Sequence, residues 1–151
     1  GLSRMLEQIT SEFIPILAEK ELVFHTEIEP NIEIVCDPNK LERVFDNLIR
    51  NAVSYSTRKT AVFLSLRRIE DAVEIIVQNK GKTIPEEKLE RIFEQFFRID
   101  TSRASATGGA GLGLAIAREI VELHGGKIQA RSEEETVTFT ITIPADCQKI
   151  V

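Results

Sequence analysis

Residues 107–116 read Thr-Gly-Gly-Ala-Gly-Leu-Gly-Leu-Ala-Ile, so four glycines fall within six positions before an apolar segment. That segment, 112–124, has helical periodicity and is followed by two glycines, which predicts a helix that ends there. Glycine lets the backbone turn sharply and approach a ligand closely. A helix N-terminus adds unpaired N–H groups and partial positive charge. The combination indicates a phosphate-binding site, and a glycine loop without a ligand is the alternative for this segment taken alone.

Two common phosphate-binding loops do not fit this stretch. The dinucleotide fingerprint requires a third glycine where Leu114 stands, and it requires a preceding strand. The nearest approach to a P-loop ends at Gly126-Lys127, but Val121 occupies the position of its first glycine. A different kind of phosphate site is therefore expected.

Hydrophobic periodicity predicts the other elements. We expect three further helices, at 3–20, 38–55 (with Asp37 as N-cap and Pro38 in the first turn) and 85–97. We expect strands at 22–28, 32–36, 60–68, 72–79, 127–131 and 136–143. Residues 99–109 are small and polar and are expected to form a loop. Because helices mix with adjacent strand pairs, the pattern favours an α+β two-layer sandwich over a parallel βαβ sheet.

Composition narrows the classes of function. A chain of 151 residues is the size of one domain. Its net charge of -5 and isoelectric point near 5.2 argue against nucleic acid as a partner. The two cysteines, Cys36 and Cys147, lack the spacing of metal ligands, which favours a reducing, cytoplasmic setting.

Two asparagines stand out on the predicted helix 38–55. Asn47 and Asn51 are four residues apart, so they lie one turn apart beside the apolar stripe of that helix. Asparagine is a poor helix former, so its use twice at the edge of a core-facing stripe indicates a function. The carbonyl oxygen of Asn51 suits Mg²⁺, which prefers oxygen ligands. A pair of solvated polar side chains is the alternative.

Four motifs now follow one another along the chain. Residues 47–52 resemble the N box, 79–85 the first glycine box, 93–98 the F box and 109–114 the second glycine box of the catalytic and ATP-binding domain of bacterial sensor histidine kinases. This domain belongs to the wider GHKL family that includes gyrase, Hsp90 and MutL. The resemblance covers about residues 5–144, and residues 99–126 are especially similar to vancomycin-resistance (VanS-type) sensor kinases.

The resemblance implies a fold and a ligand. The fold is the Bergerat ATP-binding sandwich, in which a mixed, mostly antiparallel sheet packs against three main helices. ATP would lie between the N-box helix and a lid formed by residues 99–109.

The resemblance also implies roles for individual residues. Asn51 would hold Mg²⁺ and Asn47 would support it, while Arg98 and Arg103 would reach the phosphates with their forked donors. Solvated loop charges are the alternative for the two arginines. The other implied nucleotide contacts are Tyr55, Asn79, Gly81, Gly109, Gly111, Leu112, Gly113 and Leu114.

The chain departs from the family at several positions. Asn79 stands where relatives have an aspartate that accepts from the adenine amino group, and Thr83 replaces a glycine, so we predict weaker nucleotide affinity. Ser54 stands where many relatives have a lysine. Asn47 stands where gyrase and Hsp90 have a glutamate that activates water. An amide is not a base near neutral pH, so ATP hydrolysis is expected to be slow.

A phosphoacceptor is not evident in this sequence. His25 lies on a predicted surface strand, and His124 ends a predicted helix, where it would complement the dipole and cap carbonyls. We therefore expect a single catalytic domain spanning 1–151, with residues 1–4 as the end of a preceding linker. The γ-phosphoryl group would pass to a histidine on a separate dimerisation domain.

The expected setting is a two-component system. The fragment would be monomeric and the parent a homodimeric membrane sensor, with this domain in the cytoplasm and a response regulator as an indirect partner. The alternatives are a nucleotide-sensing or interaction module and a serine kinase of the anti-sigma-factor type, which shares the fold.

Overall fold

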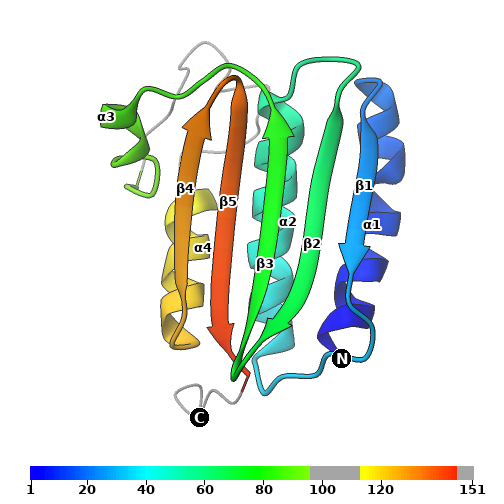
Figure 1. Ribbon diagram of the computed structural model, residues 1–151, viewed down its shortest axis with the longest axis vertical. Helices are drawn as coiled ribbons and strands as arrows, with labels where there is room; N and C mark the ends of the chain where they lie inside the picture. Colours follow the sequence, from blue (N-terminus) through cyan, green and yellow to red (C-terminus); the bar gives the residue numbers. More distant parts are fainter. Residues whose placement is uncertain (96–112, 146–151) are drawn as a thin grey trace.

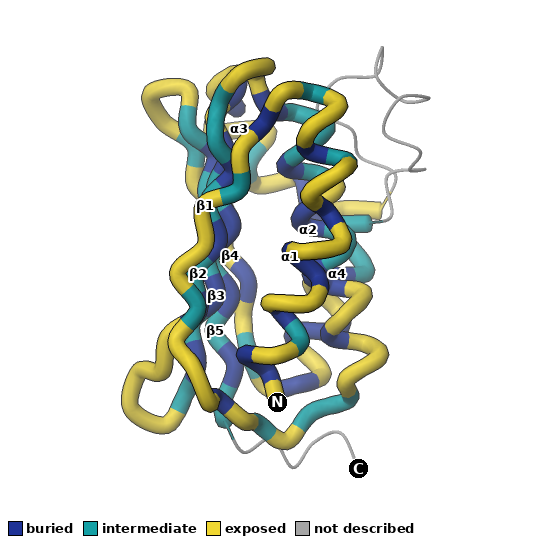
Figure 2. Tube along the Cα trace, turned by 90° about the vertical axis from the view of Figure 1, so that its right-hand side faces the viewer, coloured by how far each residue is buried: buried dark blue, intermediate teal, exposed yellow. Residues whose placement is uncertain are grey.

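The computed structural model describes residues 1–95 and 113–145, which form a five-stranded sheet with helices over one face (Figures 1 and 2). The elements are α1 (Leu2–Glu19), β1 (Val23–Ile28), α2 (Pro38–Tyr55), β2 (Ala61–Ile69), β3 (Ala72–Lys80), α3 (Glu86–Leu89), α4 (Gly113–Leu123), β4 (Lys127–Glu133) and β5 (Thr136–Pro144). The expected α+β sandwich with three main helices, α1, α2 and α4, is confirmed. None of the described helices is long and apolar enough to cross a bilayer.

The sheet is mixed and mostly antiparallel, as predicted. Its strand order is β1-β2-β3-β5-β4, and β1 pairs with β2 in parallel while the other three pairs are antiparallel. Alternate residues of β3 and β5 are buried beneath the helices, because successive strand residues point to opposite faces. The inward series on β3 is Val73, Ile75, Val77 and then the polar Asn79.

Helix α2 lies at the centre of the helical layer (Figure 1). Its buried stripe is Leu41, Val44, Phe45, Leu48, Ile49 and Ala52. Asp37 caps it by accepting from the Lys40 N–H at 3.2 Å, and Pro38 occupies the first turn, as the sequence predicted. Helix α4 ends before Gly125, whose φ of 77° is the left-handed conformation that glycine adopts at helix C-termini.

Two predicted elements are wrong in extent. Residues 32–36 are not a strand, since only Val35 forms a bridge, donating to the Ala145 carbonyl at 3.1 Å. The helix predicted at 85–97 is the short α3, followed by turns to residue 95. Arg91 donates three residues back, to the Lys88 carbonyl, and the ring of Phe93 packs edge-on against Phe139 at 6.1 Å. Packing of this segment on the sheet therefore replaces the regular helix that its periodicity favours.

The first residues of the chain take part in the packing. We expected residues 1–4 to be the end of a linker, but Leu2 and Ser3 lie in the first turn of α1 and are buried. The Ser3 hydroxyl donates to the Glu29 carbonyl at 2.6 Å and accepts from the Ile32 N–H at 2.8 Å. This pair of bonds fixes the start of α1 against the loop after β1. The predicted lid, 99–109, lies outside the described residues.

Candidate functional site

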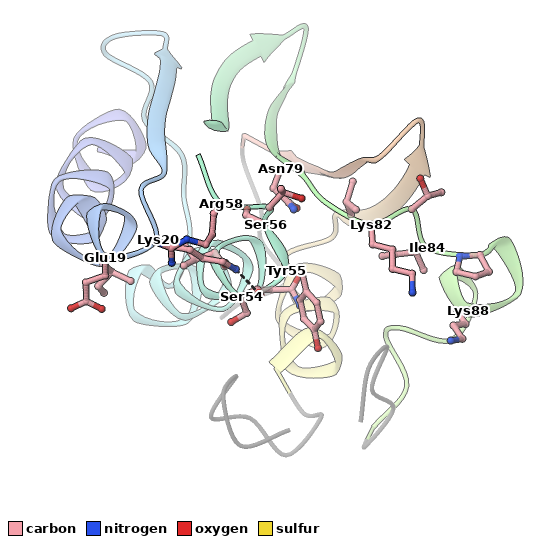
Figure 3. A pocket seen from close by; sticks show the side chains of 17 residues that line it. Glu19, Lys20, Ser54, Tyr55, Ser56, Arg58, Asn79, Lys82, Ile84 and Lys88 are labelled. Carbon is pink, nitrogen blue, oxygen red and sulfur yellow. Dashed lines mark hydrogen bonds between the residues drawn. The ribbon is translucent and has the colours of Figure 1, made fainter. Parts of the chain in front are cut away.

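A cavity of about 1090 Å³ lies where α2 and β3 end, between the C-terminal end of α1 and the segment that carries α3 (Figure 3). Its lining comes from segments far apart in sequence: Ile16, Glu19, Lys20, Asn51, 53–58, Asn79, 82–85, Lys88 and Val137. Three predicted site residues, Asn51, Tyr55 and Asn79, are therefore brought together around one space.

The two asparagines of α2 singled out in the sequence, Asn47 and Asn51, have different neighbours. Asn51 lines the cavity and is half-buried. One turn earlier, Asn47 donates through Nδ2 to the Gly113 carbonyl at 3.1 Å, which joins α2 to the first residue of α4. A Cβ placed on Gly113 would lie 3.8 Å from the Asn47 Cγ, an ordinary contact. Among the described residues, nothing fills the space beside Gly113, and a ligand approaching the start of α4 would occupy it.

Asn79 is the most unusual polar group in the site. It continues the core-facing series of β3, lies in register between the buried Val62 and Val137, and is 2% exposed. Its Nδ2 has no hydrogen-bond partner among the described residues. An unsatisfied buried donor costs about 1–3 kcal/mol. Asn79 also lines the cavity, although the unpaired Nδ2 atom itself is buried, so this polar residue stands between the core and the cavity.

Gly81 has a different role from the glycine at position 113. A Cβ on Gly81 would collide with the Tyr55 carbonyl, and the Gly81 N–H donates to the Glu135 carbonyl at 3.0 Å. The end of β3 thus passes directly against the last residue of α2. Glycine is needed here because two backbones approach each other closely.

Thr83 ties the wall of the cavity to the β4–β5 hairpin. Its hydroxyl accepts from the Glu135 N–H at 2.8 Å, and the next residue, Ile84, donates its N–H to the Ser132 hydroxyl at 2.8 Å. Glu134 and Glu135 form the hairpin turn with φ of 50° and 56°. A threonine at this position therefore supplies a bond that a glycine would lack.

Cationic side chains surround the cavity, and sequence reasoning missed them. Among the described residues, the lining includes Lys20, Arg58, Lys82 and Lys88 and one carboxylate, that of Glu19. Lys82 and Lys88 come from the segment around α3, across the cavity from Tyr55 (Figure 3). No periodicity marks these cations, because they reach the cavity from three separate segments: the end of α1, the turn after α2 and the segment that carries α3. Arg58 is paired with Glu21 at 2.6 Å, so part of this charge is neutralised within the protein. The positive charge that remains suits a polyanionic ligand.

Lys20 also stabilises the end of α2. Its ammonium donates to the carbonyls of Val53 and Ser54 at 2.7 and 3.0 Å, in the last turn of the helix, where a cation is favourable. This α1 residue thereby fixes the part of α2 that carries Tyr55.

The donor set fits a cation that arrives with its ligand. Among the described residues, no three His, Cys, Asp or Glu side chains are placed to hold a metal. The amide oxygen of Asn51 is one hard ligand at the edge of the cavity. Mg²⁺ keeps waters and phosphate oxygens as its other ligands, so a single protein oxygen is compatible with it.

The remaining predicted residues divide into two groups. Leu114 is half-buried in the first turn of α4. Arg98, Arg103, Gly109, Gly111 and Leu112 lie outside the described residues, so their predicted roles stay predictions.

The two histidines are placed differently. His25 is exposed on β1, as predicted. His124 is 0% exposed; its Nδ1 lies 2.9 Å from the Ile120 carbonyl, and its Nε2 accepts from the Asp37 N–H at 3.1 Å. The predicted capping of a carbonyl is confirmed. A ring that donates at one nitrogen and accepts at the other is neutral, so it caps by hydrogen bonding rather than by charge.

Comparison with known proteins places the chain among kinases. The family described as "Histidine kinase-, DNA gyrase B-, and HSP90-like ATPase" matches residues 36–146. Sensor protein VanSC of Enterococcus gallinarum is 49% identical over 95% of this chain and 39% of its own length. Sensor protein VanS of Enterococcus faecium is 44% identical over 93% of this chain and 36% of its own. The chain thus spans well under half of these relatives.

Solved structures agree with this placement. The nucleotide-free catalytic domain of the histidine kinase ThkA has a TM-score of 0.86 at 29% identity, covering 98% of this chain and 95% of its own. Full-length ShkA in complex with AMPPNP has a TM-score of 0.81 at 26% identity, covering 95% of this chain and 30% of its own. Together with the cavity and its motif residues, these likenesses show that the chain belongs to the histidine kinase-, DNA gyrase B- and HSP90-like ATPase family, as a catalytic domain of the histidine kinase type.

Proposed function

We propose that this chain is a single catalytic domain that binds Mg-ATP in the cavity and donates the γ-phosphoryl group to a histidine on a separate dimerisation domain of a larger parent. The observation that carries the proposal is the gathering of Asn51, Tyr55 and Asn79 around one cation-rich cavity, next to the Asn47–Gly113 bond. Two motifs distant in sequence thus meet where a nucleotide would lie.

Different residues of the site would contact different parts of the nucleotide. The buried amide of Asn79 would contact the purine, and Tyr55 would flank the base or the ribose. The amide oxygen of Asn51 would be a ligand of the Mg²⁺ that accompanies the nucleotide. The N-terminal turn of α4, in which Gly113 lies, would receive the phosphates on its backbone N–H groups, with Arg98 and Arg103 as further cations.

Bound Mg-ATP supplies an activated phosphoryl group, and the protein's contribution is positioning and neutralisation of charge. Asn47 is held against α4 through its Nδ2 and offers an amide, which does not abstract a proton from water near neutral pH. Water is therefore a poor nucleophile in this site, and the phosphoryl group is kept for an external histidine.

The parent would supply what this chain does not offer. His124 is buried and hydrogen-bonded at both nitrogens, and His25 lies on β1, the edge strand of the sheet. Because the relatives are named sensor proteins, we propose a homodimeric membrane sensor whose catalytic domain is cytoplasmic and whose histidine passes the phosphoryl group to a response regulator.

The test is calorimetric titration of the chain with Mg-ATP, wild type beside Asn51→Ala. Loss of the cation ligand is expected to weaken binding by roughly tenfold or more, in line with a charge-assisted contact of about 1.5–3 kcal/mol. Asn39→Ala is the matched control, because Asn39 is exposed in the first turn of the same helix. Equal affinities for wild type and Asn51→Ala would contradict the assignment.

A second step tests transfer. The parent's dimerisation domain, supplied separately with the chain and radiolabelled ATP, is expected to acquire an acid-labile, base-stable phosphohistidine. Binding of ATP without transfer would favour the nucleotide-sensing module. Acid-stable phosphoserine on a partner would favour the serine kinase.

A further inference from the structure

Lys20 comes from the end of α1, yet its ammonium binds α2. The residue lies just beyond the last residue of α1, lines the cavity, and donates to the Val53 and Ser54 carbonyls at 2.7 and 3.0 Å. It also lies outside residues 36–146, the range that the family model matches. A residue beyond the matched range therefore reaches the wall of the proposed nucleotide site (Figure 3).

The end of α2 has no cation of its own. No basic residue lies in the last turn of this helix, all of which the structure describes, although the C-terminal end of a helix carries partial negative charge. Lys20 supplies the cation from the neighbouring helix. Its backbone is fixed as well, because its N–H donates to the Leu17 carbonyl at 3.0 Å and Leu17 is buried in the core. The two bonds to α2 thus start from a rigid base.

The turn that Lys20 holds carries part of the site. Tyr55 is the last residue of α2 and lines the cavity, and its carbonyl lies against Gly81 at the end of β3. Asn51 lines the same cavity one turn earlier. Because Tyr55 directly follows the two residues whose carbonyls Lys20 binds, a shift of this turn would move the Tyr55 side chain first. The nucleoside end of the site, which Tyr55 is proposed to flank, would be affected most.

We propose that Lys20 is a positioning residue of the nucleotide site: it holds the last turn of α2 so that Tyr55 can flank the nucleoside, and it does not act on the phosphates. The inference rests on the proposed function, because it concerns the same cavity, and it assigns α1 a part in nucleotide binding. Direct contact of the ammonium with the phosphates is the competing explanation, since Lys20 is one of the cations that line the cavity.

Two ligands separate these explanations, because Mg-ATP carries the nucleoside and the phosphates whereas adenosine carries the nucleoside alone. Their dissociation constants are measured by nuclear magnetic resonance titration for wild type, Lys20→Met and Lys20→Arg. Lys20→Met nearly keeps the length of the side chain without its charge, and we expect it to weaken the binding of both ligands by a similar factor of roughly three- to tenfold. Lys20→Arg keeps cationic donors and is expected to bind both ligands more tightly than Lys20→Met.

Lys40→Met is the matched control. Lys40 is exposed in the first turn of α2, at the opposite end of the helix from the cavity. This change removes the same charge, and it is expected to leave both dissociation constants within about twofold of wild type. An equal loss of affinity in Lys40→Met and Lys20→Met would overturn the inference, because overall charge would then explain the effect.

The chain offers a direct probe of the turn itself. It contains one tyrosine and no tryptophan, so tyrosine emission reports on Tyr55 alone. In the nucleotide-free chain, Lys20→Met is expected to lower the fluorescence anisotropy of Tyr55 and to increase its quenching by acrylamide, because the turn loses its bonds to α1. Lys40→Met should give the same signal as wild type.

Unfolding curves set a temperature at which every variant is folded. If Lys20→Met does not fold, Lys20→Gln takes its place, because its neutral amide can still donate to one carbonyl. Losses of about threefold are then expected for both ligands.

The outcomes separate the inference from the proposed function. A wild type that does not bind Mg-ATP contradicts the proposed function. The inference is overturned, with the function left standing, if wild type binds Mg-ATP but not adenosine, or if Lys20→Met loses affinity for Mg-ATP alone. Unchanged affinity of Lys20→Met for both ligands, or an unchanged Tyr55 signal, overturns the inference as well.

Discussion

Gly81 and Gly113 both belong to glycine motifs, but the protein surrounds them differently. At Gly81 the space for a side chain is taken by the Tyr55 carbonyl, whereas at Gly113 a Cβ would only touch Asn47 at 3.8 Å. The first glycine is required by the fold. At Gly113 the described residues would tolerate a Cβ, so the space beside this glycine is open to a ligand.

The two alanine variants should therefore separate stability from binding. Gly81→Ala is expected to lower the free energy of unfolding by about 1–3 kcal/mol, as overpacking does. Gly113→Ala is expected to leave stability unchanged or slightly higher, since alanine favours helix, while it weakens Mg-ATP binding because its methyl group meets the phosphates. Thermal unfolding and titration measure the two effects, and equal losses of stability would contradict this division.

At the scale of elements, side chains near the ends of helices and strands join neighbouring elements. His124 joins the end of α4 to the N-cap of α2, Lys20 joins α1 to the end of α2, and Thr83 joins the segment after β3 to the β4–β5 hairpin. These contacts fix both ends of α2, the helix that carries Asn47 and Asn51. Two of these joints, those of His124 and Lys20, lie outside the sequence motifs, and they position the helix that carries the site.

Removal of the His124 joint is expected to destabilise the domain. His124→Ala would leave the Ile120 carbonyl and the Asp37 N–H without their ring partner and open a cavity, so we expect a loss of about 2–4 kcal/mol in denaturant unfolding. His25→Ala, on the exposed face of β1, serves as the control and should change stability by less than about 0.5 kcal/mol. A His124→Ala variant as stable as the control would show that the joint contributes nothing.

At the scale of the whole molecule, the described part of the chain presents a nucleotide site together with one buried and one exposed histidine. We therefore expect the domain to bind its ligand alone and to need another domain to complete the proposed reaction.

The isolated chain is accordingly expected to bind Mg-ATP without labelling itself and to hydrolyse ATP slowly. Chelation of Mg²⁺ with EDTA should weaken ATP binding by tenfold or more, because the phosphate charges would then repel one another and Asn51 would lose its partner. Phosphate release assays and acid and base treatment of the labelled chain measure these properties. Stable phosphohistidine on the isolated chain would overturn the need for a separate acceptor.

The sequence alone determined the class of fold, most element positions and the family. The apolar stripe of α2, the Asp37 cap and the Gly125 stop are local features that follow from periodicity and backbone preference, so they can be predicted without a structure. The motif residues of the site could be named for the same reason, since their identity and order lie in the chain.

Only the tertiary structure decided what those residues touch. Most of the helix predicted at 85–97 is absent from 85–95, where Phe93 packs on Phe139. The strand predicted at 32–36 is absent as well, and Val35 alone forms a bridge, to Ala145. The buried, unpaired Nδ2 of Asn79 and the group of cationic side chains that line the cavity both arise only when separate segments of the chain come together. Contacts between distant residues depend on packing and on which groups remain without a partner, and neither property is local to the sequence.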